Sequence, residues 1–224
     1  MRRLAALGGI ALFAALAVSA QAVHPLTGRR IAPAMGPAGA DWLDRSDREK
    51  EEAPEAALDA IGIAPGMIVA DVGAGTGYIS AKLARRVGPT GRVYAEDIQP
   101  EMLDRVRDNS EEAHLNNIET VLGSEADPRL PAGRIDVELL VDVYHEFSQP
   151  QKMLQALRRA LRKDGRLVLL EYRKEDPSIP IRPDHKMSIA EVRTEVEAEG
   201  FRLDKVIDTL PRQHLFIFRR APDQ

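Results

Sequence analysis

The chain has 224 residues, a formal net charge of -4 and no cysteine. This length suits one α/β domain with a full core. No block of basic residues stands out, which argues against a nucleic-acid partner. The lack of cysteine excludes disulfides, cysteine nucleophiles and thiolate metal sites, and we predict no metal site from the sequence.

The first 22 residues have the pattern of a secretory signal peptide. Arg2 and Arg3 precede an apolar stretch at 4–18, and an Ala-x-Ala arrangement ends at Ala22. We expect cleavage after Ala22 and export, to the periplasm. An uncleaved anchor is the alternative, but the apolar stretch is shorter than the ~20 residues of a membrane span. No later segment is apolar enough for stable membrane insertion.

Residues 23–60 are predicted to form an N-terminal extension with a cap helix, ahead of a main domain at 61–224. The start of this segment is rich in Pro, Gly and Ala, and Pro54 suits the first turn of a helix. The segment around Trp42 has two interpretations. It caps the ligand pocket, which we favour, or it is a solvated helix with pairs such as Asp44–Arg48.

Strand and helix patterns then alternate, which predicts a doubly wound α/β sheet. We expect strands at about 67–72, 92–98, 117–123, 134–144, 166–172, 201–208 and 213–220, and helices at about 76–87, 100–114, 150–161 and from 188 onward. Ser148 with Gln151 and Ser188 with Glu191 are predicted capping boxes. The short Leu210-Pro211 connection predicts antiparallel pairing of the last two strands. The sheet is therefore seven-stranded and mostly parallel with an antiparallel C-terminal strand.

The stretch VADVGAGTGYIS, residues 69–80, places a glycine loop between the first strand and its helix. No Lys-Ser or Lys-Thr follows the glycines, so the loop is not a P-loop for nucleoside triphosphates. A dinucleotide loop prefers G-x-G-x-x-G, and Tyr78 occupies the position of that third glycine. Asp71 would repel a pyrophosphate. S-adenosylmethionine has an amino group, a sulfonium and no phosphate, and the loop favours it.

Glu96 and Asp97 end the second predicted strand, about 20 residues beyond the loop. From this place a carboxylate accepts hydrogen bonds from ribose hydroxyls. The pair supports a nucleoside ligand without choosing between a dinucleotide and S-adenosylmethionine.

Four segments in this order resemble the class I S-adenosylmethionine-dependent methyltransferases. They are DVGAGTGYIS, VYAEDIQPEML, LPAGRIDVELLVDVYHEF and LRKDGRLVLLEY. The resemblance covers about 64–219 and implies a Rossmann-like fold and methyl transfer, with S-adenosyl-L-methionine as methyl donor.

The resemblance also implies which residues bind the cofactor. The loop residues hold its methionine part and Asp97 holds the ribose, with Glu96 as the substitute if the register slips by one. For the adenine, Ser124 stands where an acid is expected, so Glu125 or Asp127 takes that role. The predicted cofactor-binding residues are Asp71, Gly73, Ala74, Gly75, Tyr78, Glu96, Asp97, Ile98, Ser124, Glu125 and Asp142.

The end of the fourth strand supplies the candidate catalytic residues, His145 and Tyr144. His145 is either a general base or a residue that packs on the cofactor and orders the next loop. Glu171 and Tyr172 end the fifth strand at the same edge. The segment 182–188, with His185 and Lys186, is either a substrate lid or a polar helix entry. We expect a structural role for His214.

Three functions compete. The leading one is an S-adenosylmethionine-dependent methyltransferase acting on a small-molecule acceptor. The second is an exported protein that binds S-adenosylmethionine or S-adenosylhomocysteine without catalysis. A nicotinamide oxidoreductase is the third. Neither the acceptor nor the oligomeric state follows from the residues.

Overall fold

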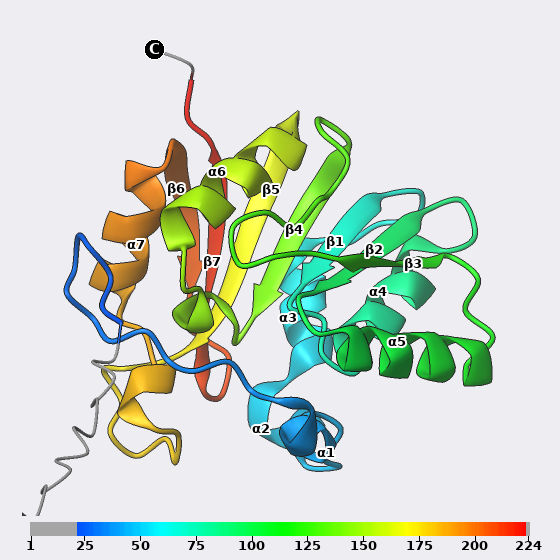
Figure 1. The fold of residues 1–224 in the computed structure, drawn as a ribbon, viewed down its shortest axis with the longest axis horizontal. Coiled ribbons are helices and arrows are strands. Elements are labelled where there is room, and N and C mark those ends of the chain that lie inside the picture. The colour runs from blue at the N-terminus through cyan, green and yellow to red at the C-terminus, as the bar shows by residue number, and fades with distance from the viewer. Residues whose placement is uncertain (1–21, 223–224) are drawn as a thin grey trace, which may run out of the picture.

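The computed structural model of the protein describes residues 22–222, which contain one seven-stranded sheet with the order β3-β2-β1-β4-β5-β7-β6 (Figure 1). The strands are β1 (Ile68–Val72), β2 (Arg92–Asp97), β3 (Ile118–Leu122), β4 (Ile135–Val141), β5 (Leu161–Tyr172), β6 (Phe201–Ile207) and β7 (Gln213–Arg220). β1 to β5 pair in parallel, and β7 runs antiparallel to both β5 and β6. The predicted fold class and the antiparallel finish are confirmed.

Helices cover both faces of the sheet and enclose two main core clusters. The helices are α1 (Ala40–Leu43), α2 (Arg48–Glu52), α3 (Pro54–Ile61), α4 (Tyr78–Val87), α5 (Pro100–Glu112), α6 (Pro150–Ala160) and α7 (Ile189–Ala198). α6 and α7 bury their apolar sides on one face, and α3 and α4 on the other. Because Ala57, Leu58 and Ile61 of α3 belong to the core, the predicted boundary at residue 60 falls in a helix that packs with the main domain.

One predicted helix cap and one predicted helix start differ from the structure. α6 begins at Pro150 with Gln149 as its N-cap and without a side-chain cap, so the predicted capping box at Ser148 and Gln151 is wrong. Proline at the first helical position makes Gln149, and not Ser148, the N-cap residue, while the start at residue 150 agrees with the prediction. α4 begins at Tyr78 because the preceding Gly77 has a left-handed φ of 86°. The capping box of Ser188 and Glu191 is confirmed.

Two strand bounds also differ. β4 ends at Val141 rather than 144, because Asp142 has a left-handed φ of 52° and breaks the extended chain. Tyr144–Glu146 then forms a single 3₁₀ turn, η2. β5 begins at Leu161, directly after α6, and is longer than predicted.

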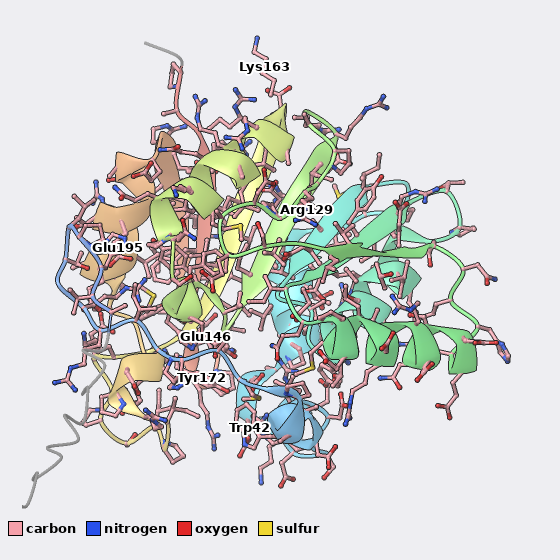
Figure 2. All side chains as sticks on the ribbon, viewed as in Figure 1. Trp42, Arg129, Glu146, Lys163, Tyr172 and Glu195 are labelled. Carbon is pink, nitrogen blue, oxygen red and sulfur yellow. The ribbon has the colours of Figure 1, made fainter. Side chains whose placement is uncertain are left out.

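The parallel strands end along one edge of the sheet, and two other segments lie along that edge. Lys163 lies near the beginning of β5 at the surface of the molecule, and Tyr172 lies at the other end of the strand (Figure 2). α1, α2 and the segment that contains the 3₁₀ turn η3 (Pro183–His185) lie at the Tyr172 end (Figure 1). In such sheets ligands bind at this edge where the strand order switches, here between β1 and β4.

The predicted signal peptide falls on residues 1–21, which lie outside the described residues, and on Ala22. Export therefore stays a prediction. Within 22–222, none of the helices has the length and the apolar character that crossing a membrane requires.

Glu138 is a buried acid in the middle of β4. Its side chain is 0 % exposed, and neither carboxyl oxygen has a hydrogen-bond partner among the described residues. Burial raises the pKa of Glu138 well above its usual range. An unpartnered buried polar group costs about 1–3 kcal/mol, so this residue destabilises the fold.

We expect Glu138→Met to raise the free energy of unfolding by about 1–3 kcal/mol. Because the folded pKa of Glu138 is raised, its unfavourable contribution grows as the pH rises above the unfolded value near 4.5. The gain should therefore be larger at pH 7.5 than at pH 4.5. Urea unfolding at both pH values measures it, with Glu119→Met on exposed β3 as the control. A gain that is independent of pH would contradict the assignment.

Candidate active site

The glycine loop between β1 and α4 has a backbone shape that glycine adopts without strain. Gly73 has a φ of 70° and Gly75 a φ of 55°. A Cβ placed on Gly73 would lie 2.4 Å from Cγ2 of Val143, which follows β4. The loop therefore lies directly against the chain that leaves the neighbouring strand, at the switch in strand order.

Both acids at the end of β2 bind the backbone of this loop. The N–H of Gly75 donates to Oδ2 of Asp97 at 3.0 Å, and the N–H of Gln99 donates to Oδ1 of Asp97 at 2.9 Å. The N–H of Gly73 donates to Oε2 of Glu96 at 3.3 Å. Burial raises the pKa of both carboxyls, that of Glu96 well above its usual range. Asp97 uses both oxygens here and Glu96 only one.

Asp71 lies in β1 and Asp142 directly follows β4, so these two acids flank the switch. Asp71 is 2 % exposed, and the hydroxyl of Ser80 donates to its Oδ2 at 2.6 Å. Burial raises the pKa of Asp71 to about 6. Nε2 of Gln213 donates to Oδ2 of Asp142 at 2.7 Å, whereas Oδ1 of Asp142 is buried with no partner within 22–222. Burial raises the pKa of Asp142 well above its usual range.

This arrangement fits S-adenosylmethionine. Four acids gather around the glycine loop, and a ligand with an ammonium and a sulfonium group compensates their charge. Oε1 of Glu96 and Oδ1 of Asp142 have no partner among the residues described, and each can accept a hydrogen bond from a hydroxyl or an ammonium group. The close approach of Gly73 to Val143 leaves no room for a side chain at the loop. Bound there, the ligand supplies an activated methyl group.

The remaining predicted cofactor residues have more varied places. Ala74 is buried, and its N–H donates to the carbonyl of Glu96 at 2.8 Å. The hydroxyl of Tyr78 donates to Oε1 of Glu49 at 2.6 Å, so this ring contacts α2. Ile98 directly follows the acids of β2 and is 40 % exposed. If the acids bind the ribose, this apolar side chain is placed to contact the base of the nucleoside.

The predicted adenine segment forms a tight turn after β3. Ser124 and Asp127 bond each other through their backbones, and the hydroxyl of Ser124 also donates to the Asp127 carbonyl at 3.1 Å. Glu125 is contacted by Nε2 of Gln149 at 3.5 Å. The structure does not choose among these three residues, and the adenine contact stays a prediction.

The side chain of Tyr144 is packed inside the protein and is not open to the active edge of the sheet. It is fully buried, its ring meets that of Phe147 edge to face at 5.6 Å, and the guanidinium of Arg29 lies 5.3 Å from its ring centre. This placement favours a structural role over the predicted catalytic one.

His145 belongs to a chain of polar groups that joins three segments. Its Nδ1 lies 2.6 Å from Oε2 of Glu171 at the end of β5, and its Nε2 lies 3.1 Å from Nδ1 of His185 in η3. Burial lowers the pKa of His145, but the charge of Glu171 and the hydrogen bond to it outweigh burial and raise that pKa overall. Burial and the charge of His145 lower the pKa of His185. Burial raises the pKa of Glu146 to about 7.

The N-terminal extension lies on the glycine loop through α1 and the residue that follows it. The hydroxyl of Thr76 donates to Oδ1 of Asp44 at 2.7 Å, and a Cβ on Gly75 would lie 2.7 Å from Cδ1 of Leu43. Trp42 instead is 40 % exposed and stacks on Arg45. The segment therefore lies against the glycine loop with Leu43 and Asp44, and its role as a cap over the ligand stays a prediction.

α2 adds a buried ion pair that sequence reasoning missed. Nε of Arg48 donates to Oε2 of Glu52 at 2.8 Å, and the hydroxyl of Tyr172 donates to Oε1 of Glu52 at 2.7 Å. The i,i+4 spacing of Arg48 and Glu52 was a usable signal for the pair. Its contact with the end of β5 was not readable from spacing. The pair fixes α2 to the edge of the site.

Comparison with known proteins gives the same family as the site. The sequence model of the family described as "Methyltransferase domain" matches residues 63–207. The ubiquinone/menaquinone biosynthesis C-methyltransferase UbiE of Vibrio campbellii is 33 % identical over 121 residues, covering 52 % of this chain and 46 % of that protein. The UbiE protein of Hahella chejuensis is 31 % identical over 125 residues, covering 55 % and 49 %. The chain spans about half the length of these curated relatives.

Solved structures agree with this result. A SAM-dependent methyltransferase from Aquifex aeolicus matches 83 % of this chain and 98 % of its own, with a TM-score of 0.79 and 29 % identity. A putative type 11 methyltransferase from Sulfolobus solfataricus matches 78 % and 95 %, with a TM-score of 0.64 and 21 % identity, which supports the fold alone. The matched region contains the glycine loop and the four acids around it, Asp71, Glu96, Asp97 and Asp142. We conclude that the chain belongs to the methyltransferase-domain family and is a methyltransferase with S-adenosylmethionine as its methyl donor.

Proposed function

We propose that this methyltransferase acts on a small-molecule acceptor. The observation that carries the proposal is the cover over the active edge. The N–H of Ala32 donates to the carbonyl of His145 at 3.1 Å, and Nε2 of Gln99 donates to the carbonyl of Met35 at 3.0 Å. The extension is thus attached at both sides of the switch. A covered edge admits a small acceptor and hinders a folded macromolecule.

The relatives support the same class of acceptor. The Vibrio campbellii protein is named as a C-methyltransferase of ubiquinone and menaquinone biosynthesis. Because the aligned region is about half of that protein, its acceptor is not transferred to this chain. We carry over only the class, a small molecule with a carbon, oxygen or nitrogen nucleophile.

Little chemistry is required from the protein beyond alignment. Methyl transfer from a sulfonium is an in-line displacement, and holding the nucleophile in line with the methyl supplies several kcal/mol, up to about 7–11. Glu171 occupies Nδ1 of His145, so Nε2 is the ring atom that can act on an acceptor. This nitrogen serves either as the base that takes a proton from the acceptor or as an atom that binds a metal ion.

Turnover of the purified protein tests the proposal. Incubation with S-adenosylmethionine and a panel of phenols, quinols and amines should produce S-adenosylhomocysteine only with a matching acceptor, and mass spectrometry should find the methylated product. The same incubation with folded proteins and RNA is the comparison. Methyl transfer to those macromolecules alone would overturn the proposal, and so would the absence of any stimulated turnover while the cofactor binds.

We also propose that the protein is exported and cleaved after Ala22. The support is the sequence pattern of residues 2–22. Cleavage there leaves the buried residues His24 and Arg29 in the mature chain. The intact mass of the protein recovered from the expressing cells tests this, and a chain that retains Met1 in a soluble cytoplasmic fraction would refute it.

A further inference from the structure

His145, Glu146 and His185 bring three metal-ligand atoms together at the edge where β4 and β5 end. His145 and Glu146 lie in η2 and His185 in η3, forty residues further along the chain. Nε2 of His145 is 3.1 Å from Nδ1 of His185, and Oε1 of Glu146 is 3.9 Å and 3.8 Å from these two nitrogens. Figure 2 labels Glu146, and Tyr172 in the same view marks the end of β5.

The three distances have the size that a bound ion requires. A circle through the corners of a triangle with sides of 3.1, 3.8 and 3.9 Å has a radius of about 2.1 Å. Zinc binds histidine nitrogen at about 2.0–2.1 Å and carboxylate oxygen at about 2.0–2.2 Å. A tetrahedral ion lies slightly out of that plane, toward a fourth ligand. The donor atoms therefore need almost no rearrangement to bind an ion.

A carboxylate behind the cluster fixes the orientation of His145. Oε2 of Glu171 lies 2.6 Å from Nδ1 of His145, and the side chain of Glu171 is fully buried. In the neutral ring Nδ1 then carries the proton and Nε2 has the free lone pair, directed at His185. Metal-binding histidines characteristically donate their other ring N–H to such a carboxylate.

We propose that His145, Glu146 and His185 bind one divalent first-row transition-metal ion of the zinc type. Two histidines and one carboxylate are the donor set of catalytic zinc sites and of two-histidine, one-carboxylate iron sites. Both types keep a coordination position open for water or substrate. The side chains of Glu146 and His185 are 13 % and 20 % exposed, which gives an ion a route from solvent. The sequence prediction of no metal site is revised by this proposal.

The role of the ion toward the acceptor rests on the proposed function. An acceptor with a hydroxyl group takes the open position, and coordination lowers the pKa of that hydroxyl. Its proton passes to solvent, and the resulting oxyanion bonds to the methyl carbon while the methyl–sulfur bond breaks and neutral S-adenosylhomocysteine leaves. Where a ring carbon activated by the oxyanion attacks instead, that carbon afterwards loses its own proton to solvent. Zinc-bound water shows the same effect, with a pKa near 7. The acceptor class is therefore a phenol, an enol or a related hydroxyl compound.

Titration of the metal-free protein with Co²⁺ tests the site without any turnover. We expect one Co²⁺ per chain, with the intense visible absorption of a four-coordinate ion, and displacement by an equimolar amount of Zn²⁺. His185→Gln should weaken Co²⁺ binding by more than the ~10- to 100-fold typical of a lost outer partner. Glu171→Gln should weaken it within that ~10- to 100-fold range. Circular dichroism checks that each variant is folded.

His214→Gln is the matched control. Nε2 of His214 lies 3.2 Å from Oε2 of Glu175, so this variant removes a similar histidine–carboxylate pair outside the cluster. Co²⁺ binding should be unchanged. Absence of a bound Co²⁺, or equal loss in the control, would overturn the site, and the contact of His145 with His185 would then be a simple hydrogen bond. A site that binds Co²⁺ in a protein that does not bind S-adenosylmethionine would refute the proposed function alone.

Discussion

Replacing Arg29 by methionine is expected to lower the free energy of unfolding by about 3–5 kcal/mol. Arg29 is 7 % exposed, and its Nε donates to both carboxylate oxygens of Glu195 on α7, at 2.9 and 3.0 Å. The side chain of Glu195 is fully buried. Methionine keeps most of the buried apolar volume and removes the charge, so Glu195 is left as an uncompensated buried carboxylate.

The contacts around this pair explain why the loss is large and where it acts. The hydroxyl of Thr27 also donates to Glu195, and Nε2 of His24 lies 3.5 Å from its Oε2. Neither group replaces the charge of a guanidinium. Nη1 of Arg29 donates to the carbonyl of His145 at 3.1 Å, so the extension and the candidate active site lose a common anchor.

Urea unfolding at neutral pH measures the effect. Arg30→Met, at the exposed neighbouring position, is the control and should change the free energy of unfolding by no more than about 0.5 kcal/mol. The double variant Arg29→Met with Glu195→Leu should recover most of the loss, because no buried charge then remains. If the double variant is as unstable as Arg29→Met alone, packing of the extension, and not the ion pair, carries the stability.

Local patterns predicted the sheet well because each strand and helix carries its own signal. Buried strands are short apolar runs, and α4, α5 and α7 have apolar residues at helical spacing. The glycine loop was readable for the same reason, since VADVGAGTGYIS contains the strand, the turn and the helix start in one segment. The errors at Ser148 and at residues 142–144 arose where one residue changed the local geometry. These residues are Pro150, which fixes the helix start, and Asp142 with its left-handed φ.

Contacts between distant segments were not predictable in the same way. His185 was placed in a segment with two open interpretations, and nothing in its spacing indicated that it faces His145. Arg29 lies in a stretch without any period, 166 residues before Glu195. Such pairs are fixed by how helices and loops pack on the sheet, and a single sequence contains no signal for that packing. The site's acids were predicted, and their partners across the fold were not.

Replacing Asp97 by asparagine is expected to weaken binding of S-adenosylmethionine and S-adenosylhomocysteine by about 10- to 100-fold. Hydrogen bonds to a charged group contribute about 1.5–3 kcal/mol, and each 1.4 kcal/mol is a factor of ten. Asp97 uses one oxygen for the N–H of Gly75 and the other for the N–H of Gln99. Asparagine has a single acceptor oxygen, so one of these N–H groups loses its partner and the ribose hydroxyls lose a carboxylate.

Glu96→Gln is the matched variant, and we expect it to weaken binding by less than about 3-fold. Burial and the charge of Asp97 raise the pKa of Glu96 well above its usual range, and its Oε2 accepts the N–H of Gly73. Glutamine has nearly the shape of glutamate and keeps one oxygen for the N–H of Gly73, which is the only hydrogen bond of the Glu96 side chain among the described residues. The two neighbouring acids therefore differ in role although both contact the loop.

Isothermal titration of both variants with S-adenosylhomocysteine measures this difference. A second titration with methylthioadenosine and its 2′-deoxy analogue identifies the contact. The wild type should bind the 2′-deoxy analogue more weakly, because the carboxylate of Asp97 then lacks the hydroxyl that donates a hydrogen bond to it and no other donor replaces that hydroxyl. Asp97→Asn should bind both analogues nearly equally. If Glu96→Gln, and not Asp97→Asn, binds the two analogues equally, Glu96 is the residue that binds the ribose. The ribose position in the sequence is then shifted by one residue, and Asp97 only holds the backbone of the loop.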